Sequence, residues 1–142
     1  MPQDFDPVAD YPVATSRPDL LKTPTGKTLD DITLTAVLDG SVVADDLRIT
    51  PEALELQAQV ADAVDRSQLA QNFRRAAELT RVGDERMLQI YNALRPRASS
   101  KEQLEAIADE LEHEFDATVN AELVRDAARV YEQRDLLARP AR

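Results

Sequence analysis

The sequence contains no cysteine, no tryptophan and only one histidine among its 142 residues. Without cysteine the chain has no disulfide, no thiolate nucleophile and no cysteine-ligated metal, which fits a reducing cytoplasm. Glycine occurs three times and aromatic residues make up 4%. So little glycine argues against an all-β fold rich in tight turns, and so few rings leave Leu, Ile, Val and Ala to build the core.

Positive charge and long apolar runs are also scarce. The 27 Asp and Glu residues outnumber the 17 Lys and Arg residues, which gives a net charge of −10. This charge repels nucleic acid and anionic membrane surfaces. No apolar run of roughly 18 residues is present to span a bilayer, and the acidic, proline-punctuated N-terminus is unlike a signal peptide. We therefore expect a folded chain with neither a nucleic-acid nor a membrane partner.

Proline is concentrated at one end of the chain, since five of the eight prolines fall in residues 1–27. Each proline fixes φ and removes a backbone donor, so no regular helix is expected there. The sequence predicts an extended, proline-rich N-terminal arm over residues 1–27, ordered only against something else. A helical domain over residues 28–142 is expected to follow.

Helix start and stop signals after the arm predict an all-α fold of about five or six helices. The first is a short segment from Thr28 to Gly40, for which a strand is the alternative, and Asp45-Asp46-Leu47 adds one further turn. Later helices are expected from Thr50-Pro51 to about Asp65, from Ser67 to about Arg81, from an Asp84 cap to Pro96, from a Ser99/Glu102 capping box, and from about Thr118 to Leu137.

Apolar spacing predicts which face of each long helix is buried. The expected faces are, in chain order, Ala53/Leu56/Val60/Ala63, Leu69/Phe73/Ala76/Thr80, Met87/Ile90/Tyr91/Leu94, Leu104/Ile107/Ala108/Leu111/Phe115 and Leu123/Ala127/Val130/Tyr131.

Two local features imitate functional motifs. Gly26-Lys27-Thr28 matches the end of a phosphate-binding P-loop, but that motif needs a glycine five residues before Gly26, where this chain has Leu21. We interpret it as a turn leading into a Thr28-capped helix. His113 lies in an acidic run, off the expected apolar face, and has no second histidine with which to ligate a metal. It is expected to be a solvated surface residue.

Charged pairs are frequent but fit structural roles. Asp30-Asp31, Asp45-Asp46 and Asp109-Glu110 fall near helix starts or on polar faces, where the helix dipole or water favours them. The 14 Arg against three Lys suit interface ion pairs, and a genomic base bias explains them equally well. Arg74-Arg75 and Arg95-Pro96-Arg97 are expected to pair locally. The sequence thus predicts no catalytic, cofactor-binding or metal-binding residue in this chain.

Several short segments carry a family resemblance. They are Asp10-Tyr11-Pro12, Lys27-Thr28-Leu29-Asp30-Asp31, Asp46-Leu47-Arg48-Ile49-Thr50-Pro51-Glu52, Asn72-Phe73-Arg74-Arg75-Ala76-Ala77-Glu78-Leu79-Thr80, Ile90-Tyr91-Asn92-Ala93-Leu94-Arg95-Pro96, Ser100-Lys101-Glu102 and Ile107-Ala108-Asp109-Glu110-Leu111-Glu112. In this order, over about residues 10–137, they resemble the small (gamma) subunit of the adenosylcobalamin (coenzyme B12)-dependent diol and glycerol dehydratases.

The resemblance implies a subunit of a lyase. Such enzymes convert 1,2-propanediol or glycerol to an aldehyde and water by a radical mechanism, and are dimers of heterotrimers of large, medium and small subunits. In that family the substrate lies in the large subunit, and adenosylcobalamin lies between the large and medium subunits. The small subunit is mostly helical, docks on the large one and has no catalytic residues. The alternative is a free-standing helical protein-binding or regulatory module.

The resemblance also bears on location and contacts. A bacterial cytoplasmic enzyme is expected; some family members are encapsulated in microcompartments through an N-terminal extension, and no such extension is seen before Asp10. Tyrosine and arginine are favoured interface anchors, but Tyr91 also fits the buried face of its helix, and the spacing favours that interpretation. The expected subunit-interface residues are Tyr11, Pro12, Tyr91, Asn92, Arg95 and Pro96.

Overall fold

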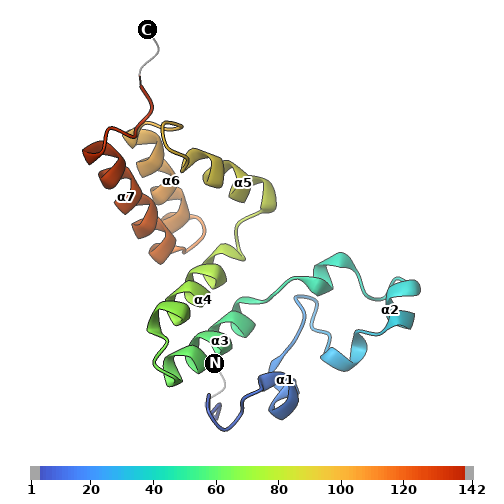
Figure 1. Cartoon of the computed structure of the whole chain (residues 1–142). Helices are drawn as coiled ribbons and strands as arrows, with labels where there is room; N and C mark the ends of the chain where they lie inside the picture. Colours follow the sequence, from blue (N-terminus) through green and yellow to red (C-terminus); the bar gives the residue numbers. More distant parts are fainter. Residues whose placement is uncertain (1–3, 140–142) are drawn as a thin grey trace. The chain divides into compact units, whose positions relative to one another are not determined.

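The computed structural model describes residues 4–139, and within that range it contains helices and turns but no β-strand (Figure 1). The predicted all-α class is confirmed. Seven α-helices are present in the described chain, and five of them, α3 to α7, have ten or more residues. The chain divides into two compact units, one ending at Ala77 and the other beginning at Glu78. Each unit has its own buried apolar cluster.

The N-terminal stretch contains helical turns, which corrects the prediction of a uniformly extended arm; its residues 1–3 lie outside the described range. Helix α1 spans Val13–Ser16, and a 3-10 turn spans Pro18–Leu20. Pro12 precedes the first helix and Pro18 begins the second turn, where a missing N–H group leaves no helical hydrogen bond unmade. Val13 is only 3% exposed, so this stretch contributes to the interior of its unit.

A loop of short helical turns occupies residues 28–49, and we name it the α2 loop. It opens with a 3-10 turn, Leu29–Asp31, whose Asp31 carboxylate accepts hydrogen bonds from the Thr28 N–H at 2.7 Å and the Thr28 hydroxyl at 2.8 Å. Helix α2 spans Leu34–Leu38. The further turn expected at Asp45-Asp46-Leu47 is confirmed as a 3-10 turn, Ala44–Leu47.

The single helix expected from Thr28 to Gly40 is wrong, and so is its strand alternative. A second cap causes the break, because the Thr33 hydroxyl accepts a hydrogen bond from the Ala36 N–H and starts α2 afresh. Gly40 adopts φ +79°, a left-handed conformation that suits glycine, and the helix stops before it as expected.

Helices α3, Pro51–Ala63, and α4, Ser67–Leu79, form the long elements of the first unit. The predicted start at Thr50-Pro51 is confirmed, because the Thr50 hydroxyl caps the Ala53 N–H. The predicted buried faces are largely wrong. Only Leu56 of the expected α3 face is buried, and none of the expected α4 face is. The buried positions are Leu54, Leu56, Ala58 and Ala61 on α3 and Ala70 on α4.

Alanine explains this shift of the buried face. Ala58, Ala61 and Ala70 form one buried cluster, with Phe73 packed against it. The contact between α3 and α4 is thus made by small side chains, and larger ones lie at its edge. Leu69, expected in the core, is accordingly 39% exposed.

The second unit contains α5, Asp84–Ala93, α6, Lys101–His113, and α7, Thr118–Gln133. Gly83 rather than Asp84 is the N-cap of α5. The capping box of α6 pairs Ser100 with Gln103 and not Ser99 with Glu102, a shift of one residue. The Ser99 hydroxyl instead donates to the Ala93 carbonyl at 2.9 Å, and so closes the α5–α6 connection.

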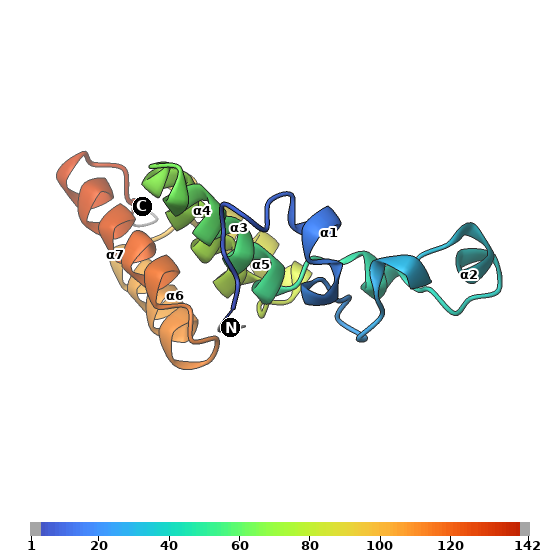
Figure 2. The same ribbon diagram turned by 90° about the horizontal axis from the view of Figure 1, so that it is seen from below.

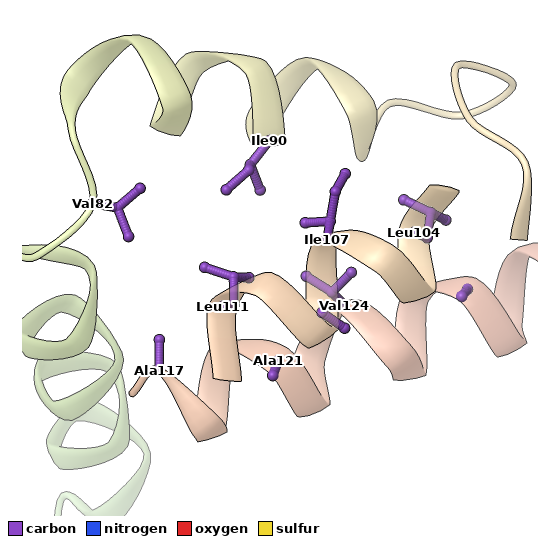
Figure 3. Close-up of a cluster of buried hydrophobic side chains, with 10 residues drawn as sticks. Val82, Ile90, Leu104, Ile107, Leu111, Ala117, Ala121 and Val124 are labelled. Carbon is purple, nitrogen blue, oxygen red and sulfur yellow. The ribbon is translucent and has the colours of Figure 1, made fainter. Parts of the chain in front are cut away.

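The core of the second unit lies where these three helices meet (Figure 3). The face predicted for α6 is confirmed, because Leu104, Ile107, Ala108 and Leu111 are buried and Phe115 packs against them. The face predicted for α7 is wrong in most positions: Leu123 is 45% exposed, and Tyr131 alone packs against the core. The buried apolar side chains at this end of the chain are Ala117, Ala121, Val124 and Ala128, and Asn120 is buried beside them.

A carboxylate from the last turn of α4 caps α7. Glu78 accepts hydrogen bonds from the N–H groups of Val119, at 3.1 Å, and Asn120, at 3.0 Å, and from the Asn120 side-chain amide at 2.7 Å. The N-cap residue of α7, Ala117, makes no side-chain capping hydrogen bond. Glu78 therefore satisfies amide groups that the helix leaves open, and a negative charge there matches the helix dipole.

Candidate functional site

Metal-binding side chains do not cluster in the part of the chain that the structure describes. Within residues 4–139, no group of three or more His, Cys, Asp or Glu side chains is arranged to hold a metal ion. His113 is exposed at the last position of α6, as predicted. Over the same described residues, no helix combines the length and apolarity that crossing a membrane requires. That this chain carries no catalytic, cofactor-binding or metal-binding residue stays a prediction.

The acidic pairs noted in the sequence have structural partners. Asp109 pairs with Arg125 at 2.7 Å. The Arg86 guanidinium donates from Nε to Glu110 Oε1 at 2.8 Å and from Nη2 to Oε2, and these bonds hold the pKa of Glu110 below its usual value. Both carboxylates thus form ion pairs that join helices of the second unit, which is a structural role.

Asp46 is the most enclosed carboxylate among the described residues, with a side chain 0% exposed. It accepts hydrogen bonds from the hydroxyls of Thr23, at 3.0 Å, and Thr25, and Lys27 Nζ lies 3.1 Å from its Oδ2. The Val43 N–H donates to it at 2.9 Å. We name this cluster the Asp46 clamp: it joins the turn before the α2 loop to the far end of that loop.

The clamp explains the turn whose sequence resembles the end of a phosphate-binding loop. Gly26, at φ +89°, and its neighbours form a turn into the Thr28-capped 3-10 helix, as predicted, and Lys27 pairs with the Asp46 carboxylate.

The pKa of Asp46 is held well below its ordinary value by the groups around it. The largest contribution comes from the Thr25 hydroxyl, followed by the Val43 N–H and then by Lys27 and Thr23. A lowered carboxyl pKa adds stability above the unfolded-state pKa and loses it as the pH falls through the folded value. The clamp is therefore intact at neutral pH.

Four of the six predicted interface residues lie together at the end of α5. Tyr91 is 68% exposed, which overturns its interpretation as a core residue, and Asn92, Arg95 and Pro96 are exposed beside it. Tyr91 points away from the core because Ile90, its neighbour, occupies the buried side of the helix. These four exposed residues offer a ring, an amide and a guanidinium within six positions of the sequence.

Tyr11 and Pro12, the other two predicted interface residues, belong to the first unit. Both are exposed, Tyr11 at 57%. Tyr11 lines a hollow of about 510 Å³ whose other walls include Val60, Leu69 and Phe73. This part of the arm therefore borders an apolar depression on α3 and α4.

The two arginine-rich segments differ in whether they form ion pairs. Arg74 pairs with Asp62 at 2.8 Å and with Glu55 at 3.3 Å, so the local pairing expected there is confirmed. Within residues 4–139, neither Arg95 nor Arg97 has a carboxylate partner. Arg95 is therefore available to a carboxylate on another molecule.

Sequence analysis missed a set of exposed apolar side chains in the α2 loop. Leu34, Leu38 and Leu47 are each more than 70% exposed. Their signal was present in the sequence: α2 has apolar residues at positions i, i+3 and i+4 but only five residues, too few to bury that face in a helix pair.

Comparison with known proteins places the whole arrangement in a family. A family model described as dehydratase small subunit matches residues 7–138. Two proteins named propanediol dehydratase small subunit, from Citrobacter freundii and from Salmonella typhimurium, are each 55% identical to this chain over 130 residues. The aligned region covers 92% of this chain, and 76% and 75% of those two proteins respectively. The matched range includes both compact units and all the helices described above.

Proposed function

This chain belongs to the dehydratase small-subunit family, and from that membership we propose that it is the small structural subunit of an adenosylcobalamin-dependent propanediol dehydratase. Such an enzyme is a hydro-lyase that converts a 1,2-diol into an aldehyde and water. The observation that carries the proposal is the 55% identity to two propanediol dehydratase small subunits across nearly the whole chain. Glycerol is the second substrate in the family that the sequence resembles.

We propose that partner chains bind the cofactor and carry out the reaction. The hollow beside Tyr11 is walled mainly by apolar side chains, with Gln57 and Arg66 as its main polar groups. A corrin with its amide side chains and nucleotide needs many more hydrogen-bonding groups than that. These residues do not fit adenosylcobalamin, and we assign no reaction step to this chain.

The proposed partners are a large and a medium dehydratase subunit, assembled with this chain as a dimer of heterotrimers. We place the complex in the bacterial cytoplasm, free or inside a microcompartment, because the two relatives come from bacteria. The N-terminal arm, residues 1–27, is proposed to contribute to assembly through Tyr11 and Pro12, both of which are exposed.

Co-expression of the tagged chain with the large and medium subunits tests this function. We expect all three chains to co-purify in equal amounts, and the product to form aldehyde from 1,2-propanediol only when adenosylcobalamin is added. Omitting the small chain is the control and should lower the yield of assembled enzyme. A tagged chain that purifies alone and monodisperse would instead support the free-standing binding module.

Tyr91→Ala and Arg95→Ala are expected to weaken assembly without unfolding the chain. Both side chains are exposed, and truncating an aromatic or arginine anchor at an interface costs about tenfold or more in affinity. Each variant is co-expressed with an equal amount of differently tagged wild-type chain, and the ratio of the two in the purified complex is measured by mass spectrometry. Arg129→Ala, on the exposed face of α7, is the matched control. Equal incorporation of the variants would remove these residues from the interface.

A further inference from the structure

The α2 loop exposes a continuous series of large apolar side chains. Leu34 is 76% exposed, Leu38 78% and Leu47 72%, and another four fall between 46% and 55%. These four are Leu29, Val37, Val43 and Ile49. Within the loop only Val42 and Asp46 are buried. Large apolar patches are rare on monomeric proteins and mark contact surfaces when they occur.

Hydrogen bonds hold the loop in shape even though it has almost no core of its own. The Asp46 clamp joins its two ends. Within it, the Ala36 carbonyl accepts hydrogen bonds from the Val42 N–H at 2.9 Å and the Ser41 hydroxyl at 3.1 Å. A segment fixed in this way loses little further conformational freedom when it binds, so more of the contact energy appears as affinity.

The geometry of α2 presents one apolar ridge. Leu34, Val37 and Leu38 are separated by three and four residues and so lie on the same side of the helix. In both ribbon views α2 lies apart from the α3–α4 pair of its own unit (Figures 1 and 2). No helix of that unit covers the ridge, which leaves it open to another chain.

Charge indicates what kind of surface would cover the ridge. Residues 28–49 contain five Asp and a single basic residue, Arg48, which pairs with Asp45 at 3.3 Å. Asp30 and Asp39 are exposed as well. A complementary partner therefore offers an apolar groove bordered by Lys or Arg side chains. At the base of the loop, a hollow of about 310 Å³ is lined by apolar residues such as Leu21 and Ile32 and also by polar ones such as Thr28, and it can receive a side chain from that partner.

The extent of the loop also suits a subunit contact. A standard protein interface takes roughly 20–30 residues from each partner, and the α2 loop, residues 28–49, has 22. We propose that the α2 loop is the surface by which this chain docks on a larger dehydratase subunit, with Leu34 and Leu38 inserted into a basic-rimmed apolar groove. The inference rests on the proposed function, which supplies the partner.

A competition during assembly tests the inference. The Leu34→Gln/Leu38→Gln double variant and the wild-type chain, carrying different tags, are co-expressed in equal amounts with the large and medium subunits. Both replaced side chains are exposed and glutamine favours helix, so the free variant should keep the wild-type circular dichroism. We expect the variant to be depleted tenfold or more from the purified complex, relative to two wild-type copies with the same tags.

The Val119→Gln/Leu123→Gln double variant is the matched control. It also removes two apolar side chains spaced by four residues, here 42% and 45% exposed on α7. We expect it to enter the complex in the wild-type ratio. Equal incorporation of the Leu34/Leu38 variant, or equal depletion of both variants, would overturn the inference. A wild-type chain that captures no larger subunit would overturn the proposed function itself, and the two failures are distinguishable.

A charge reversal tests the expected rim of the groove. Asp30→Lys places a positive charge beside the ridge and should deplete the variant severalfold in the same competition. Glu122→Lys makes the same reversal on an exposed position of α7 and should leave the ratio unchanged. Wild-type incorporation of Asp30→Lys would contradict a basic border on the partner's groove.

Discussion

Leu111→Ala is expected to lower the free energy of unfolding by about 3–5 kcal/mol, because truncating a buried leucine removes apolar contacts and leaves a cavity. Leu111 is 1% exposed and lies among buried side chains from α6 and α7 (Figure 3). Its neighbours there include Ala117 and Ala121, whose short side chains do not extend into the space that a lost leucine leaves. The site therefore relaxes little, and the cost falls toward the upper end of the range. Urea unfolding followed by circular dichroism measures it.

Leu123→Ala is the matched control for this change. It makes the same truncation on α7, at a side chain that is 45% exposed, and should cost less than about 1 kcal/mol. Comparing the two variants also tests which face of α7 is buried, because apolar spacing assigned Leu123 to the core. Equal losses in the two variants would mean that the face observed in the structure is not the one that packs.

Glu78→Ala is expected to lower the stability of the second unit by about 2–3 kcal/mol, because hydrogen bonds to a charged group are worth about 1.5–3 kcal/mol. The substitution leaves the N–H groups of Val119 and Asn120 without their acceptor. It also removes Glu78 as an acceptor for the side-chain amide of Asn120, a residue that is 5% exposed. The loss is measured by thermal or urea unfolding, with hydrogen exchange at the first turn of α7 as the local readout.

Glu78→Gln separates charge from hydrogen bonding at the same position. Glutamine keeps one acceptor oxygen but neither the charge nor the second acceptor, so it should recover roughly half of the lost stability. Glu122→Ala, an exposed position one turn into α7, serves as control and should be close to neutral. If Glu78→Ala leaves the first turn of α7 fully protected, the cap contributes nothing and the prediction is wrong.

Helix starts were more predictable than buried faces, for a physical reason. A helix start depends on a few adjacent residues. At α3, for example, the Thr50 hydroxyl caps the helix, and Pro51 occupies the first helical position, where proline is tolerated. Even the error at α6 was a single residue, because Ser99 and Ser100 are equally good caps and only the fold gives Ser99 another partner. Which face of a helix is buried depends on the helix that packs against it, and that second helix is distant in the sequence.

Alanine accounts for most of the errors in the buried faces. Spacing rules give weight to large apolar residues, so they favoured Leu123 on α7 and Leu69 on α4. The helices instead meet through small residues such as Ala58, Ala70 and Ala121, all 0% exposed. Close approach of two backbones buries alanine fully and displaces leucine to the edge of the contact.

The candidate binding surfaces were predictable only in part. The family resemblance pointed to the end of α5, and the structure shows those residues exposed. The ridge of the α2 loop was not foreseen, because its residues were assigned to one segment from Thr28 to Gly40, whereas the structure has the five-residue helix α2 there. The Asp46 clamp was equally hidden, because it joins residues about 20 positions apart through side-chain hydrogen bonds.

The small core of the first unit has a consequence for how a cell maintains this protein. Its buried cluster contains three alanines and a partly buried phenylalanine, while the apolar ridge on α2 is exposed to solvent. A newly made copy without partners thus presents the kind of surface that chaperones and proteases recognise in damaged proteins. On the proposed function, we expect unassembled copies to be degraded faster than assembled ones, so that the abundance of this chain follows that of the larger subunits.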